Sequence, residues 1–152
     1  MSLLTFSVAG QSLTPTKFSA GARQFEVLID EPPSLGGADE AANPVEYILA
    51  GYAGCLNVVG HLVARELGIP LRRLSIRISG QIDPARFLGE KTSERAGYQS
   101  LHVELLPEAD ASPGQLAAWL QIVEDRCPVN DSLRNPTPVS ISLLLAEQQT
   151  LN

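Results

Sequence analysis

The sequence predicts an α+β fold within a single domain that spans residues 1–152. Two patterns lead to this prediction. Short segments in which apolar and polar residues alternate are typical of strands with one solvated face, and here they come in pairs. Between the pairs runs a long segment that is apolar on nearly every face, which is typical of a buried helix. We therefore expect antiparallel sheets wrapped on a long central helix.

The first predicted strands precede the long helix. Residues 3–8 alternate weakly, and residues 23–30 form a clearer strand whose apolar side chains face one side. The second strand ends at Pro32 and Pro33, because proline cannot donate a hydrogen bond to a sheet. Residues 34–42, which include two adjacent glycines, are a predicted surface loop.

Asn43 begins the predicted long helix, which covers residues 43–67. Asparagine is a favoured N-cap, Pro44 suits the first helical position, and Glu46 completes an N-x-x-E capping box. Gly68 is the expected stop signal. Because the apolar side chains fall on nearly all faces, we expect this helix to be buried on most sides.

Strand and helix signals continue after the long helix. Ser112 is a favoured N-cap, Pro113 suits a first helical position, and Pro128 ends or kinks this second helix just after Cys127. The other predicted elements are a strand at 74–82, a polar connection at 83–97, a strand at 98–106, a helical turn at 130–133 and a closing strand at 139–145. The expected order is thus β-β-α-β-β-α-β.

Charge and composition exclude several classes of partner. The net charge is -6 and the chain has no Lys/Arg cluster, which argues against binding nucleic acid or an anionic membrane surface. The first residues lack a basic segment of the kind that begins a signal peptide, and no apolar run reaches the ~20 residues of a membrane span. We therefore expect a cytoplasmic protein without a membrane association.

The two cysteines carry the clearest chemical signal. Neither a C-x-x-C motif nor a Cys/His quartet is present, so no metal site is expected. In a reducing compartment two cysteines are not expected to form a permanent structural disulfide. Two alternatives remain open at this point: inert buried thiols, which is how free cysteine commonly behaves, or a pair that reacts.

Small residues surround Cys55 on the long helix. Gly51, Gly54 and Gly60 each cost about 1 kcal/mol of helix stability relative to alanine, and close approach of another backbone is the usual reason to retain such residues. Helical spacing puts Tyr52, Val58 and Val59 on the same face as Cys55, where they would form an apolar wall around the thiol.

Three motifs give the chain a resemblance to a known family. They are N-P-x-E-x-x-L-A-x-x-A-x-C at 43–55, P-x-x-L-G-G at 32–37 and C-P-V at 127–129. With them the sequence resembles the OsmC/Ohr family of osmotically inducible and organic-hydroperoxide-resistance proteins. It is similar to an OsmC-like branch rather than to Ohr itself, because Ohr proteins carry a glutamate directly after the motif proline, where this chain has Val45.

The resemblance implies an intertwined homodimer with the cysteine helices at its centre and a thiol-dependent peroxidase that needs no cofactor. Cys55 would attack a small organic hydroperoxide and become a sulfenic acid. Cys127 would then form a disulfide with it, and an external dithiol, of lipoyl type or thioredoxin type, would reduce that disulfide.

The resemblance also implies roles for residues around the thiol. Arg23 is the expected cation that holds the Cys55 thiolate, the alternative being a solvated charge at the end of a strand. Glu46 is the expected catalytic carboxylate, the alternative being the helix cap alone. Tyr52, Val58 and Val59 are the expected substrate pocket, although core packing explains Tyr52 equally well.

A second hypothesis keeps the fold without turnover. In it the chain is a non-catalytic OsmC-like protein that binds a small apolar ligand over Cys55 or senses oxidation. A third hypothesis, an inert structural dimer, would follow if neither cysteine reacted. The sequence alone does not separate them.

Overall fold

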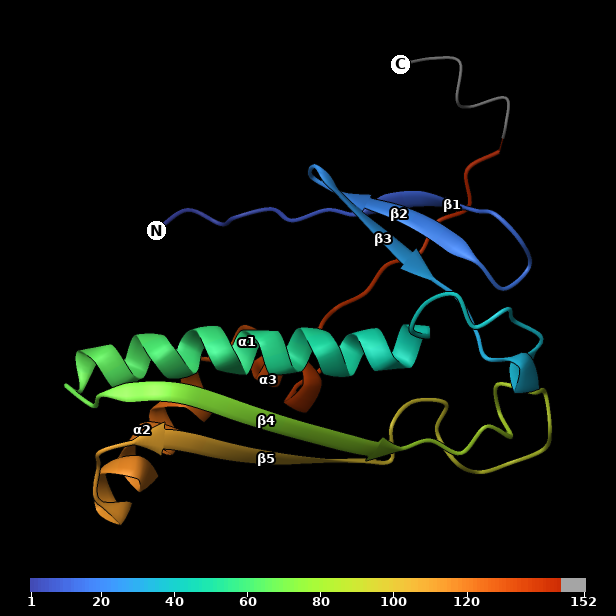
Figure 1. The fold of residues 1–152 in the computed structure, drawn as a ribbon. Coiled ribbons are helices and arrows are strands. Elements are labelled where there is room, and N and C mark those ends of the chain that lie inside the picture. Colours follow the sequence, from blue (N-terminus) through green and yellow to red (C-terminus); the bar gives the residue numbers. More distant parts are fainter. Residues whose placement is uncertain (146–152) are drawn as a thin grey trace.

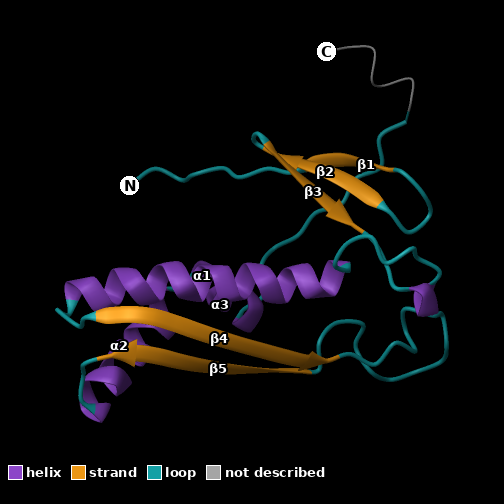
Figure 2. Cartoon of the chain, in the orientation of Figure 1, coloured by secondary structure: helices purple, strands orange, loops and turns teal. Residues whose placement is uncertain are grey.

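The computed structural model describes residues 1–145 and confirms the α+β fold (Figures 1 and 2). The elements in chain order are β1 Ala9–Ser12, β2 Phe18–Ala22, β3 Phe25–Ile29, a 3-10 turn Pro33–Leu35, α1 Pro44–Glu66, β4 Leu71–Gln81, β5 Ser100–Ala109, α2 Pro113–Arg126 and α3 Pro128–Arg134. The long helix α1 lies along the β4–β5 ribbon, and α2 and α3 pack against it from the same chain (Figure 1).

The strands form two separate antiparallel sheets, and β4 of the second packs against α1. The first has the order β1-β2-β3, with Ala9 paired to Gly21 and Ala22 paired to Phe25. The second is the long β4–β5 ribbon, in which Gln81 pairs with Ser100. Figure 1 shows the three-stranded sheet set apart from α1, near the end at which α1 begins, while β4–β5 runs along the helix. The ribbon and the helices therefore form the core, and the first sheet stands beside it.

The N-terminal cap of α1 has the predicted form. The Glu46 backbone N–H donates to Asn43 Oδ1 and the Asn43 N–H donates to Glu46 Oε2, each at 2.9 Å, which is a complete capping box. The cap satisfies two N–H groups that the first helical turn would otherwise leave without partners. The 23-residue helix that follows therefore begins at a defined residue.

Burial of α1 differs from the expectation. Only one face of the helix is buried within the described chain, and its buried members are Tyr52, Leu56, Val59, Gly60, Val63 and Ala64. Val58, on another face, is 66% exposed. By length and composition α1 could also span a membrane, but here it is the core helix on which β4 and α2 pack.

Close packing accounts for Gly60 alone among these three glycines, and there side chains rather than another backbone come near. A Cβ added at Gly60 would lie 2.8 Å from Leu74 Cδ2 and 3.1 Å from Trp119 Cζ2, so the absence of a side chain lets β4 and α2 approach α1. At Gly51 and Gly54 an added Cβ would meet no atom of the described residues within 4 Å. Close packing inside this chain therefore does not account for those two glycines.

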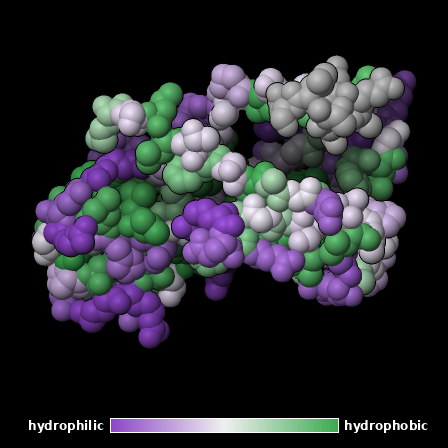
Figure 3. Space-filling view, turned by 90° about the horizontal axis from the view of Figure 1, so that it is seen from above, coloured by the Kyte–Doolittle hydropathy of each residue, from purple (hydrophilic) through white to green (hydrophobic). Residues whose placement is uncertain are grey.

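Two predicted strands are wrong within the described residues. Residues 3–8 and 139–145 form no strand there; instead the sheet begins at β1, and the unpredicted β2 lies between β1 and β3. Apolar and polar residues do alternate in these segments, but a strand also needs a partner strand to accept its hydrogen bonds. Their side chains are well exposed, as Phe6 at 87% and Ile141 at 94% show, and Figure 3 shows several apolar patches on the face seen from above.

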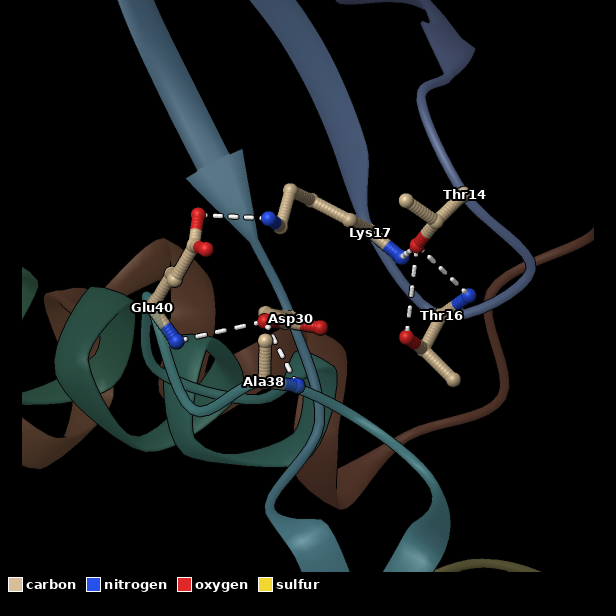
Figure 4. Close-up of polar contacts among 6 residues, drawn as sticks. All are labelled: Thr14, Thr16, Lys17, Asp30, Ala38 and Glu40. Atoms are coloured by element: carbon tan, nitrogen blue, oxygen red, sulfur yellow. Dashed lines mark hydrogen bonds and ion pairs between the residues drawn. The ribbon is translucent and has the colours of Figure 1, made fainter.

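The loop between β3 and α1 is held by a buried carboxylate (Figure 4). Asp30 is fully buried, and its Oδ2 accepts from the backbone N–H groups of Ala38 and Glu40, both at 3.2 Å. Lys17 Nζ reaches Glu40 at 2.5 Å and joins the loop to the first hairpin. These contacts fix the path of the chain between the three-stranded sheet and the N-cap of α1.

Hydrogen bonds decide the charge state of Asp30. Burial raises the pKa of its carboxyl, but donation from the backbone of Glu31, Glu40 and Ala38 and from the Thr16 side chain outweighs burial and holds that pKa below its ordinary value. The ionised form is therefore the one that the folded protein stabilises.

We expect Asp30→Asn to destabilise the protein at neutral pH and to matter less in acid. Because the folded-state pKa of Asp30 lies below the unfolded value of about 4, its contribution is present above that value and is lost as the pH falls through the folded pKa. Urea unfolding of wild type and variant at a series of pH values checks this.

The exposed carboxylate of Asp125 on α2 supplies the control. Asp125→Asn should change the free energy of unfolding by no more than about 0.5 kcal/mol. A gap between wild type and Asp30→Asn that widened on acidification would contradict the assignment of the ionised form.

Candidate active site

The two cysteines meet in the core. Cys55 Sγ on α1 and Cys127 Sγ between α2 and α3 lie 3.0 Å apart, and both are free thiols. Cys127 is fully buried, whereas Cys55 is partly exposed. The fold thus brings together the only two cysteines of the sequence, and it leaves one of them open to a reagent.

A helix break fixes the position of Cys127. Pro128 cannot continue α2, so Cys127 adopts an extended backbone with φ -79° and ψ 112° and serves both as the C-cap of α2 and as the N-cap of α3. Its backbone N–H donates to Val123 O at 3.1 Å, and its Sγ accepts from the Asn130 N–H at 3.5 Å. One hydrogen bond thus fixes the backbone of Cys127 and the other fixes its sulfur.

The two sulfurs differ in their hydrogen-bonding roles. Burial raises the pKa of the Cys127 thiol, and donation of its S–H to Cys55 raises that pKa further, while the N–H groups of Asn130 and Val129 offset part of the effect. Cys127 consequently keeps its proton and directs it at Cys55 Sγ, which is the acceptor. Cys127 is therefore the protonated member of the pair, and Cys55 is its hydrogen-bond acceptor.

A buried polar pair stands beside the sulfurs. Tyr52 donates its hydroxyl to Asn130 Oδ1 at 2.5 Å, and Asn130 Nδ2 donates to Glu124 O at 2.8 Å. Tyr52 and Asn130 are 7% and 6% exposed. Burial, followed by the nearby Cys127 sulfur, raises the pKa of Tyr52, so this hydroxyl stays a donor. The pair links α1, α2 and α3 around the thiols.

A cavity of about 660 Å³ borders this pair. Tyr52 and Asn130 form part of its wall, together with Val45 and Ile48 from the start of α1 and residues of the loop between β4 and β5. Neither cysteine lines it. The cavity therefore borders the Tyr52–Asn130 pair without reaching either sulfur.

The predicted pocket residues lie in different places. Tyr52 lines the cavity, whereas Val59 is a core residue at 8% exposure and Val58 is largely solvent-exposed. Val58 and Val59 do not line the cavity, so a role for either in binding substrate stays a prediction.

Arg23 and Glu46 are not joined to the cysteines within one chain. Arg23 lies in the turn between β2 and β3 with φ 57°, and its guanidinium carbon is 5.1 Å from the centre of the Phe25 ring. The Glu46 carboxylate accepts from the N-cap of α1. Among residues 1–145 no hydrogen bond or ion pair connects either side chain to a sulfur, so their catalytic roles stay predictions.

Sequence reasoning did not find Asn130. The local signal was present, because a side chain at the N-cap position accepts from the N–H three residues later, and Asn130 stands at that position after Cys127. The contact of Asn130 with Tyr52, by contrast, depends on the packing of α3 against α1. Arg95 and Arg134, which also line the cavity, carried no pattern that set them apart from other surface arginines.

Comparison with known proteins places this arrangement in a family. Residues 37–142 match the family described as OsmC-like protein. The chain belongs to this OsmC-like family. The matched residues include both cysteines, the cap of α1 and the helix break at Pro128. A separate sequence comparison with curated proteins finds no match.

Solved structures of the OsmC-like family have the same fold. An OsmC-like protein from Mycoplasma pneumoniae is similar with a TM-score of 0.75 at 17% identity, over 88% of this chain and 89% of that one. An organic hydroperoxide resistance protein OsmC from Legionella pneumophila has a TM-score of 0.64 at 21% identity, over 88% and 92%. An organic hydroperoxide resistance protein from Elizabethkingia anophelis has a TM-score of 0.65 at 21% identity, over 89% of this chain and 91% of that one. At these identities the likeness establishes the fold.

We expect Tyr52→Phe to lower the free energy of unfolding by about 1–3 kcal/mol, because it leaves the buried Asn130 Oδ1 without its donor. Tyr98→Phe is the matched control, since the half-buried Tyr98 hydroxyl donates to a backbone oxygen, Val45 O, at 2.8 Å. Chemical denaturation of both variants checks this. Equal losses in the two variants would argue against a special role for the Tyr52–Asn130 bond.

Proposed function

We propose that this protein is a cysteine-based, thiol-dependent peroxidase that reduces small organic hydroperoxides to alcohols. The observation that carries the proposal is the contact between Cys55 and Cys127, in which the donor is buried and the acceptor is accessible. Membership of the OsmC-like family and the fold shared with organic hydroperoxide resistance proteins support it.

In the first step the Cys55 thiolate attacks the terminal oxygen of the hydroperoxide. An S–O bond forms and the O–O bond breaks, so sulfur loses two electrons and the alkoxide leaves. The alkoxide takes a proton from the surroundings and departs as the alcohol, and Cys55 remains as a sulfenic acid. The S–H of Cys127 stabilises the thiolate before this step.

In the second step Cys127 attacks the sulfur of the Cys55 sulfenic acid. An S–S bond forms, the S–O bond breaks, and the hydroxyl leaves as water with the proton of Cys127. The two Sγ atoms already lie 3.0 Å apart, so a small movement suffices to reach the ~2.05 Å of a disulfide.

An external dithiol then completes the cycle. Its first thiolate attacks Cys55, because Cys127 is fully buried, and Cys127 leaves as the thiol. The second thiolate displaces Cys55 from the mixed disulfide. The net reaction consumes one hydroperoxide and one dithiol and gives an alcohol, water and a disulfide. A reducing compartment such as the cytoplasm maintains the thiols that this cycle needs.

One observation favours a second function, a redox sensor without rapid turnover. Val45 stands where the Ohr branch carries a glutamate, and within the described chain neither Arg23 nor Glu46 reaches the sulfurs. Such a protein would oxidise to the same disulfide but would cycle slowly with any dithiol. Multiple-turnover kinetics separate the two functions.

The proposal includes a homodimer. Apolar side chains at residues 3–8 and 139–145 are exposed in one chain, and Gly51 and Gly54 on α1 face open space within residues 1–145. A second copy that paired with these strand-like segments and approached α1 would bury them and would account for both glycines.

We expect Cys55→Ser to abolish reduction of cumene hydroperoxide and Cys127→Ser to stop after one turnover. Only Cys55 meets the peroxide, whereas Cys127 is needed to form the disulfide that a dithiol reduces. Mass spectrometry after one equivalent of cumene hydroperoxide should show a Cys55–Cys127 disulfide in wild type. In Cys127→Ser it should show a sulfenic or over-oxidised Cys55.

Each alternative has its own signature in this experiment. Full activity of Cys55→Ser, or thiols that stay reduced in wild type, would eliminate the peroxidase. A disulfide that forms once but is not cycled by dihydrolipoamide or thioredoxin would favour the sensor.

We expect the wild-type protein to sediment as a dimer at micromolar concentration, and Ile141→Asp to shift it to monomer or unfolded chain. Ile141 is 94% exposed in one chain, so a charge there is harmless unless a partner covers it. Ser140→Asp adds the same charge at the neighbouring position and is the control. Identical sedimentation of Ile141→Asp and Ser140→Asp would argue against this surface as the interface.

A further inference from the structure

The helix break at Pro128 leaves a backbone carbonyl of α2 without its ordinary partner. In an α-helix the carbonyl of one residue accepts from the N–H four residues later, so Glu124 O would normally accept from residue 128. Proline has no N–H, and Asn130 Nδ2 takes its place by donating to Glu124 O at 2.8 Å. The Asn130 side chain therefore bridges Cys127, from three residues before it to three residues after it.

The other half of the Asn130 amide bonds to α1. Because Glu124 O can only accept, the NH2 group faces it, and the amide oxygen is turned to Tyr52, whose hydroxyl donates to it at 2.5 Å. Tyr52 precedes Cys55 by three residues on α1, as Asn130 follows Cys127 by three. The Tyr52–Asn130 bond thus ties together the same two segments that the Sγ–Sγ contact of 3.0 Å joins.

Helix α3 depends on this side chain for its position. It has seven residues, and a helix of that length is marginal in water by itself, so contacts with the rest of the chain hold it. Asn130 is the one residue of α3 that is buried within residues 1–145, at 6% exposure, whereas Leu133 is 39% exposed. A buried amide is costly unless its hydrogen bonds are made, and those bonds are directional. They therefore fix the orientation of α3 as well as its distance from α1.

The position of α3 in turn sets the direction of the Cys127 sulfur. The Asn130 backbone N–H donates to Cys127 Sγ at 3.5 Å, which holds this sulfur at the N-cap of α3. To form a disulfide, the sulfur has to move from 3.0 Å to about 2.05 Å from Cys55 Sγ. A misplacement of about 1 Å lowers the rate of such a step by roughly a hundredfold. Whatever holds α3 therefore also governs how readily the two sulfurs join.

We propose that Asn130 is a positioning residue for Cys127, and that its side-chain amide holds the second sulfur in place for disulfide formation. The inference rests on the proposed peroxidase function for its effect on turnover, whereas the positioning itself acts on the thiol pair with any oxidant. The Asn130 side chain contacts Tyr52 and Glu124 rather than a sulfur, so it acts through the placement of Cys127. Its effect falls on the second step of the cycle and leaves the attack of Cys55 on the peroxide unchanged.

Loss of the positioning changes the fate of the Cys55 sulfenic acid. When Cys127 reaches it slowly, a second hydroperoxide reaches it first. The sulfenate sulfur then attacks the terminal oxygen of that hydroperoxide, a further S–O bond forms, and the O–O bond breaks. The sulfur loses two more electrons, the alkoxide takes a proton and leaves as a second alcohol, and Cys55 ends as a sulfinic acid. The ratio of sulfinic acid to disulfide therefore reports the placement of Cys127.

Equilibration with glutathione tests the positioning without any peroxide. Two glutathione thiols become glutathione disulfide as the Cys55–Cys127 bond is reduced, and the equilibrium constant gives the effective concentration of one thiol for the other. A residue that supports the reduced and the oxidised fold equally cancels in this constant. In Asn130→Ala the effective concentration should fall about tenfold or more, because Cys127 gains freedom in the reduced state. Mass spectrometry of alkylated samples measures the constant.

Asn135 supplies the matched control. It is an exposed asparagine at the other end of α3, and its Nδ2 donates to Asp131 O at 3.1 Å. Asn135→Ala thus removes an amide that stabilises the same helix without bridging Cys127. Its effective concentration should stay within about twofold of wild type, since neither sulfur moves.

Oxidation by cumene hydroperoxide tests the effect on the cycle. Increasing equivalents should give mainly the disulfide in wild type and in Asn135→Ala, whereas in Asn130→Ala the ratio of sulfinic Cys55 to disulfide should rise about tenfold or more. The rate of the first step, measured in the Cys127→Ser background, should stay within about twofold when Asn130→Ala is added. A change in the ratio without a change in this rate is the signature of a positioning residue.

Tyr52→Phe decides the case if Asn130→Ala does not fold. It removes one hydroxyl, and it should lower the effective concentration by about threefold or more, because one of the two bonds that orient the Asn130 amide is lost. An effective concentration equal to that of wild type in the folded variant, or a fall that Asn135→Ala reproduces, would overturn the positioning role. A fall confined to Asn130→Ala and Tyr52→Phe in a protein that no hydroperoxide oxidises would support the positioning role and eliminate the peroxidase. Full peroxide turnover with an unchanged effective concentration would do the reverse.

Discussion

The contact of Trp119 with Gly60 sets the geometry of everything near the thiols. Trp119 Nε1 donates to Gly60 O at 2.8 Å, and the missing side chain of Gly60 lets the indole lie against α1. From Trp119 the apolar stripe of α2 continues at four-residue intervals through Val123 to Cys127, and all three are buried. Docking of this stripe on α1 brings Cys127 to Cys55.

The features that could be predicted from the sequence are those that depend on neighbouring residues. The Asn43 capping box, the stop at Gly68 and the break at Pro128 follow from local backbone chemistry, and the structure has all three. The proposed role of Cys55 also rests on a local motif. What the sequence could not give was the packing of elements distant in the chain, such as the Tyr52–Asn130 bond and the charged side of the cavity.

The strand errors have a different cause. The pattern at residues 139–145 is a good strand pattern, but in the described chain these residues pair with nothing. Alternation of apolar and polar residues predicts that one face of the segment is buried, but it does not identify the element that covers that face. The same limit applies to α1, whose apolar surface extends beyond the face covered by β4 and α2, and to Arg23, whose relation to the sulfurs no local pattern determines.

The exposed segments at residues 3–8 and 139–145 have a consequence for the newly made chain. A single copy displays apolar, strand-forming segments with free backbone donors and acceptors, which is the kind of surface that seeds aggregation. If a second copy covers these segments, as proposed above, the solubility of the chain depends on how quickly two copies meet. Assembly and aggregation would then compete for the same exposed segments, and the yield of folded material would be a kinetic quantity as much as a thermodynamic one.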